Sequence, residues 1–98
     1  MNKTNLIQLG SSLEVDKDHL LCDIEKGSVL LIHLEEQEYP FEVHDKIAEK
    51  IVCISGQFTL ETDEEQMEIH QGEMVTIRKG LRHRFGKGSK AIIMVIFG

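Results

Sequence analysis

The sequence contains no tryptophan and only one tyrosine, Tyr39. Carbohydrate sites often use aromatic faces, so this scarcity disfavours a sugar ligand. Proline is equally rare, with Pro40 alone, and the chain has no low-complexity tract, internal repeat or linker. A chain of 98 residues with these properties predicts a single domain with one core, spanning residues 1–98.

Cysteine is also scarce. Cys22 and Cys53 each lie in an apolar run, and no residues with ligand spacing surround them. We interpret both as small buried hydrophobic residues rather than as disulfide partners or metal ligands. The N-terminal stretch lacks the continuous apolar segment of a secretory signal. Together, these features predict a reducing compartment and a cytoplasmic location.

Long hydrophobic runs and a basic surplus are both missing. The longest apolar run, residues 91–97, is too short to cross a membrane and is typical of a buried strand. The net charge of −6 disfavours nucleic acid, which requires a basic face, and anionic membranes. We therefore expect neither partner. The basic residues late in the chain are interpreted as a solvated rim: Lys79, Arg82, Arg84, Lys87 and Lys90.

Helical periodicity is missing almost everywhere, and short apolar runs of strand length dominate instead. We expect strands at residues 20–24, 29–34, 41–44, 50–55, 57–62, 66–69, 74–78, 83–85 and 91–97. Residues with turn propensity separate them, including Ser55-Gly56. This pattern predicts an all-β antiparallel sandwich or barrel at residues 19–98. Residues 1–18 are expected to form an N-terminal arm or an edge strand.

Two of the expected strands, residues 51–54 and 92–96, are apolar on both faces. A strand of a monomeric antiparallel barrel normally exposes one face to water. The second apolar face therefore predicts a homodimer. Alternatively, the apolar residues of the N-terminal arm cover these strands, and the two explanations are compatible.

Acidic and imidazole side chains recur at positions that a barrel could bring together. Glu42 and His44 are two residues apart on an expected strand, so they point to the same face. Glu49 begins the next strand, and a hairpin could place it opposite this pair. His83 follows a turn that contains a glycine. Carboxylate and imidazole are ordinary ligands of first-row divalent metals, although such spacing is also common on protein surfaces.

Two stretches of the chain carry longer patterns. The first runs from Glu42-Val43-His44 through four residues to Glu49, and through six more to Gly56. The second runs from Gly72 through five residues to Arg78-Lys79-Gly80, and through two more to His83. In order and spacing these stretches resemble the two motifs of the cupin family, G-x5-H-x-H-x3,4-E-x6-G and G-x5-P-x-G-x2-H-x3-N.

The resemblance implies a double-stranded β-helix, which is a jelly-roll-like antiparallel barrel. It also places four residues at the family's metal-ligand positions: Glu42, His44, Glu49 and His83. Inward-facing positions should include Ile51, Cys53, Val75, Ile77 and Phe85. The chain departs from the motifs at four places, where it has Glu36 for glycine, Glu42 for histidine, Arg78 for proline and Lys87 for asparagine.

The substitution at Glu42 falls on a ligand position and leaves two interpretations open. Two imidazoles and two carboxylates would balance the charge of a divalent cation such as Fe, Mn, Ni or Zn, with up to two positions open in an octahedral site. Without a metal, the two carboxyl groups would share a proton or pair with the histidines. The other histidines, His19, His33 and His70, are interpreted as structural or solvated.

Three functions are compatible with these expectations. The first is a metal-dependent enzyme, dioxygenase- or isomerase-like, with a decarboxylase as a further possibility that the family implies. The second is a non-catalytic module that binds a small ligand, and the third is a structural or interaction protein with a metal-free cavity. The fold does not decide among them, because one fold hosts many activities.

Overall fold

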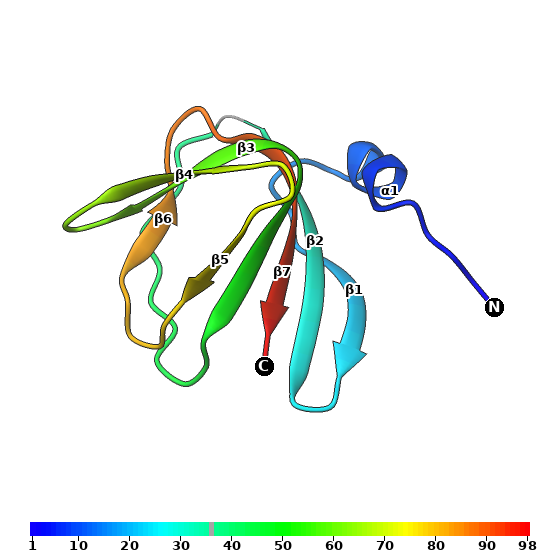
Figure 1. Cartoon of the computed structure of the whole chain (residues 1–98), viewed down its shortest axis with the longest axis horizontal. Coiled ribbons are helices and arrows are strands. Elements are labelled where there is room, and N and C mark those ends of the chain that lie inside the picture. The colour runs from blue at the N-terminus through cyan, green and yellow to red at the C-terminus, as the bar shows by residue number, and fades with distance from the viewer. Residues whose placement is uncertain (36) are drawn as a thin grey trace.

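The computed structural model describes residues 1–35 and 37–98 of the chain, so Glu36 lies outside the described residues. Within them, strands dominate and one short helix precedes them, which confirms the all-β class (Figure 1). In chain order the elements are α1 (Leu6–Ser12), β1 (His19–Ile24), β2 (Gly27–Glu35), β3 (Glu49–Thr62), β4 (Gln66–His70), β5 (Met74–Ile77), β6 (His83–Phe85) and β7 (Lys90–Phe97).

The strands form an antiparallel sheet in the order β1-β2-β7-β3-β4, and β5 and β6 also pair with β3. The order is not sequential, because the last strand, β7, inserts between β2 and β3. In Figure 1 the sheet curves so that β4, β5 and β6 lie across from β1 and β2. This arrangement is the expected double-stranded β-helix.

The long strand β3 corrects the prediction of two strands separated by a turn at Ser55-Gly56. Its first half pairs with β5 and β7, and its second half pairs with β4 and β6. The register against β7 shifts between Cys53 and Ser55, which marks a bulge. Gly56 follows with a φ of 82°, a conformation that glycine adopts without strain. The glycine therefore bends one strand from one side of the barrel to the other and does not end it.

The core lies between the two sides of the barrel. Among the expected inward positions, Ile51, Cys53 and Ile77 are 1%, 0% and 4% exposed. Val75 and Phe85 are partly buried and pack against the same cluster. Alternation along the strands thus identified the inner face correctly.

Helix α1 is an element that the sequence patterns did not predict. Asn5 caps it, since its side-chain Oδ1 accepts hydrogen bonds from the backbone N–H groups of Ile7 and Gln8, both at 3.0 Å. A Cβ at Gly10 would lie 2.5 Å from Cγ2 of Ile92, so the helix rests directly on the outer face of β7. The N-terminal arm therefore covers part of the second apolar face.

Two further expectations are wrong. Residues 41–44 do not form a strand, because only Glu42 makes an isolated bridge, to His83. Cys22 is exposed rather than buried, since it lies on the outermost strand, β1, where no other strand covers it. Cys53 is buried, and both thiols are free.

No helix in the described part of the chain is long and apolar enough to cross a membrane.

Candidate functional site

A cavity of about 220 Å³ lies between the two sides of the barrel, and all four residues at the motif ligand positions line it. Glu49 and His83 are deeply buried, with side chains that are each 5% exposed. His44 is half-buried, and the Glu42 side chain is 57% exposed. The four side chains therefore run from the barrel interior to the cavity mouth.

Three different parts of the fold position these residues. Glu49 is the first residue of β3, where it pairs with Ile77 on one side and Phe97 on the other. His83 begins β6 after the turn at Gly80, whose φ is 79°. Glu42 is held on His83 by two backbone hydrogen bonds of 2.7 and 3.0 Å.

The structure corrects how Glu49 reaches the pair of Glu42 and His44. No ladder joins residues 41–44 to β3 among the described pairings. The bridge to His83 brings that segment to the cavity instead, so the hairpin that we expected does not form.

The functional atoms converge on the carboxylate of Glu49. Its Oε1 lies 2.6 Å from Nε2 of His83 and 3.6 Å from Nε2 of His44. Nε2 of His44 is also 3.4 Å from Oε2 of Glu42. Ligand-type atoms of Glu42, His44 and His83 all lie within 4.8 Å of one another. One ion or one water could contact several of them at once.

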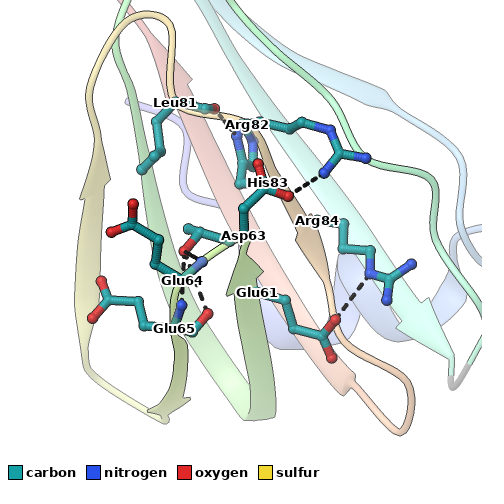
Figure 2. A network of polar contacts seen from close by, with 9 residues as sticks. Glu61, Asp63, Glu64, Glu65, Leu81, Arg82, His83 and Arg84 are labelled. Carbon is teal, nitrogen blue, oxygen red and sulfur yellow. Dashed lines mark hydrogen bonds and ion pairs between the residues drawn. The ribbon is translucent and has the colours of Figure 1, made fainter.

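His83 is oriented by the backbone two residues before it. Its Nδ1 lies 2.8 Å from the carbonyl oxygen of Leu81 (Figure 2), and a carbonyl oxygen only accepts, so Nδ1 carries the proton. That hydrogen bond points Nε2 toward Glu49. Burial alone would lower the pKa of His83, but the Glu49 carboxylate, the Leu81 carbonyl and the charge of Glu42 outweigh it, so the pKa is raised.

Two buried atoms of this cluster lack a hydrogen-bond partner among the described residues, namely Nε2 of His44 and Oε1 of Glu49. Oε1 of Glu49 does lie within ion-pair distance of both imidazoles, and its 2.6 Å contact with Nε2 of His83 is a hydrogen bond when that nitrogen carries a proton. A buried polar atom without a partner costs free energy. A divalent metal accepts both atom types as ligands, so the residues present fit a metal at this point.

An external clamp holds the segment that carries Glu42 and His44. The Arg82 and Arg84 guanidinium carbons lie 3.7 and 4.3 Å from the ring centroid of Phe41. Arg84 donates a hydrogen bond to Glu61 at 2.9 Å, and Arg82 donates one to Asp63 (Figure 2). Arg84 thus joins residue 41 to β3, and Arg82 joins it to the turn that follows β3. Arg84 is partly buried, which corrects its interpretation as a solvated rim residue, whereas the Arg82 side chain is 48% exposed, as expected for the rim.

A second polar group lines the cavity and was missed by the sequence patterns. The Tyr39 hydroxyl donates a hydrogen bond to Oδ1 of Asp16. Burial, followed by the hydrogen bond and the negative charge of Asp16, raises the pKa of Tyr39. Asp16 lies between α1 and β1, far from Tyr39 in sequence, and no local motif marks either residue.

Two of the remaining histidines lie within ion-pair distance of neighbouring acids. Nε2 of His33 is 3.2 Å from Glu35, and Nε2 of His70 is 3.4 Å from Glu68. None of the remaining three, His19 included, is among the described residues that line the cavity of the four motif residues. Their expected structural or solvated roles are consistent with these positions.

Comparison with known proteins gives one family and a consistent fold. The family model described as Cupin domain matches residues 23–97. No curated protein matches the sequence.

Solved structures supply the fold comparison. A cupin-2 domain containing protein from Shewanella frigidimarina has a TM-score of 0.79 at 14% identity, covering 94% of this chain and 90% of that one. A protein from Neisseria meningitidis has a TM-score of 0.80 at 16% identity, covering 99% and 100%. KdgF from a Halomonas species has a TM-score of 0.72 at 10% identity, covering 82% and 76%. At these identities the similarity concerns the fold alone.

Proposed function

The chain belongs to the cupin family, and we propose on that premise that its cavity binds a divalent transition metal together with a small molecule. Glu42, His44, Glu49 and His83 would hold the metal, which would be Fe, Mn, Ni or Zn. The observation that carries this proposal is the buried Nε2 of His44, which has no hydrogen-bond partner among the described residues and lies 3.4 Å from Oε2 of Glu42 and 3.6 Å from Oε1 of Glu49.

The residues of the chain prepare the site in distinct ways. The Leu81 carbonyl fixes the tautomer of His83, so that Nε2 faces the cluster. The apolar walls reduce water access on the buried side, and exposed Glu42 marks the side from which an ion enters. When bound, a metal would supply Lewis-acid activation of water or of a ligand oxygen.

A metal-free cavity is the second candidate. The 2.6 Å contact between His83 and Glu49 and the raised pKa of His83 favour an imidazolium–carboxylate pair that needs no metal. In that case the protein binds a small ligand without turnover or is structural. In the first case it is a metal-dependent enzyme, dioxygenase- or isomerase-like.

Metal titration separates the two candidates. The chain, purified without a histidine tag and stripped with chelator, would be titrated calorimetrically with Zn²⁺ and Ni²⁺. We expect one ion per chain, and a loss of at least about 100-fold in affinity for His83→Ala, because ligand loss removes roughly 3 kcal/mol or more. His70→Ala, which removes an exposed histidine outside the cavity, is the matched control and should titrate like the unmodified protein. If the two variants bind the metal ions with equal affinity, or if the unmodified chain binds none, the metal proposal is wrong. The second candidate, a metal-free cavity, would then remain.

We also propose that the protein is a cytoplasmic homodimer. Val52, Met94 and Ile96 lie on the outer face of β3 and β7 and are only partly buried. Helix α1 covers this face only near Ile92. The rest of the apolar face therefore stays available to a second chain. This surface supports the proposal because a monomer gains nothing from leaving it apolar.

A further inference from the structure

Asp16 offers an unsatisfied acceptor at the cavity. Its Oδ1 accepts hydrogen bonds from the Tyr39 hydroxyl and, at 3.3 Å, from the backbone N–H of Glu35. Its Oδ2 is buried and has no hydrogen-bond partner among the described residues. Because an unpaired buried acceptor is costly, this oxygen favours a ligand that brings a donor.

The charges around the cavity point to the same kind of ligand. Carboxylates line it at four described positions, Asp16, Asp18, Glu42 and Glu49. Arg84 is the one arginine or lysine among the described lining residues, and its guanidinium is already engaged by Glu61 and Phe41. The imidazoles of His44 and His83 face Glu42 and Glu49, which leaves Asp16 and Asp18 as the described lining carboxylates that no imidazole faces. Near these two residues a ligand carboxylate or phosphate would meet repulsion, whereas an ammonium group would be attracted.

The walls and the volume limit the size of the ligand. Between the two polar groups the lining is aliphatic and aromatic, with Leu30, Ile32, Leu34, Phe85 and Val95. A volume of about 220 Å³ equals roughly seven waters at about 30 Å³ each. That space suits a chain of a few carbons and is too small for a typical drug-sized ligand.

We propose that the cavity selects small primary amines with a short apolar chain, and that Asp16 receives their ammonium group. The inference rests on the proposed function only in treating the cavity as a small-molecule site, and it requires no metal. Tyr39 is a positioning residue, since its hydroxyl occupies Oδ1 and leaves Oδ2 for the ligand.

Three probes with the same four-carbon chain test the charge preference: n-butylamine, n-butanol and butyrate. Each would be titrated calorimetrically into the chelator-treated chain. We expect n-butylamine to bind at least about tenfold more tightly than butyrate, as for a charge-assisted hydrogen bond. Butyrate binding as tightly as n-butylamine, or no binding of any probe, would overturn the proposal.

Matched amide variants locate the ammonium group. Asp16→Asn keeps the left-handed backbone at φ 57°, which asparagine tolerates, and should weaken n-butylamine binding about tenfold without changing n-butanol binding. Asp23→Asn removes the same charge from an exposed position on β1, outside the lining, and should change the binding of neither n-butylamine nor n-butanol.

Binding of n-butylamine that survives Asp16→Asn but is lost in Glu49→Gln would place the amine at the Glu/His cluster and refute the role of Asp16. If Asp16→Asn does not fold, the three probes on the unmodified chain still decide the charge preference. A chain that takes up metal but not amine refutes this inference alone, and the reverse outcome refutes only the metal proposal.

Discussion

At the scale of single residues, the candidate site depends on backbone groups and on side chains outside the ligand set. A backbone carbonyl, that of Leu81, sets the tautomer of His83. Glu42 is held by one isolated bridge rather than by a strand. A segment with so few backbone hydrogen bonds needs side-chain contacts to keep its position. The rings and guanidinium groups of the external clamp supply those contacts.

Replacing Phe41 by leucine tests the clamp. The change removes the aromatic face that both arginines contact, at a cost of about 0.5–1 kcal/mol for each contact. We expect Zn²⁺ affinity to fall about fivefold or more, because Glu42 and His44 lose their fixed position. Calorimetric titration with Zn²⁺ measures the effect.

Two controls accompany this variant. Phe41→Tyr keeps the aromatic face and should restore affinity. Phe58→Leu alters a fully buried aromatic residue that lies outside the cavity lining, so it should lower the free energy of unfolding but not Zn²⁺ affinity in the folded protein. Equal Zn²⁺ affinity in Phe41→Leu and the unmodified chain would show that the clamp does not position the ligands.

At the scale of elements, β3 organises the barrel, because it pairs with four other strands. This is possible only if the strand bends, and the bend occurs at the bulge and at Gly56. A Cβ at position 56 would lie 2.2 Å from the backbone oxygen of Lys90. Neither the conformation nor the space suits any other residue.

Gly56→Ala should therefore destabilise the fold more than an alanine at another glycine of similar conformation. Gly72 is the matched control, since its φ is 86° and a Cβ added there would have nothing within 4 Å. Gly72→Ala should cost about 1–2 kcal/mol from the backbone conformation alone. Gly56→Ala should cost at least ~1 kcal/mol more, because strands must separate to relieve the contact. Urea unfolding measures both, and equal losses would contradict the role of the close approach.

At the scale of the whole molecule, the outer face of the sheet is the surface on which we expect two copies of the chain to associate. Helix α1 covers the region of Ile92, while Met94 and Ile96 stay partly exposed further along the same strand. The N-terminal arm and a second copy of the chain can thus share one apolar surface. The structure bears out the cover by the N-terminal arm, and the homodimer stays a prediction.

Sedimentation equilibrium at tens of micromolar tests the homodimer. We expect the unmodified chain to sediment as a dimer and Met94→Glu to sediment as a monomer, because a carboxylate buried in an apolar interface is costly. Met67→Glu makes the same chemical change on β4, at a side chain that is 48% exposed, and should leave the dimer intact. A monomeric unmodified chain would remove the homodimer.

Several properties of this protein depend on local pattern and could be predicted from its residues alone. Alternation placed Ile51, Cys53 and Ile77 in the core, and motif spacing identified the family. The same spacing selected the four side chains that meet in the cavity, whose role as metal ligands stays a prediction. Turns at glycines such as Gly80 could be predicted, because a positive φ is a local requirement that glycine meets without strain.

Other features depend on neighbours that are distant in sequence, so they could be seen only in the folded chain. A glycine at position 56 is equally compatible with a hairpin turn and with a bent strand. The close contact with the backbone of Lys90 on β7 shows that the strand bends and continues. The pairing of Asp16 with Tyr39 joins residues that no short motif connects. Cys22 is exposed because β1 is the edge of the sheet, and strand order is not encoded in the apolar pattern of one strand. Each of these features arises from contacts through space, which chain closure creates and local propensity does not specify.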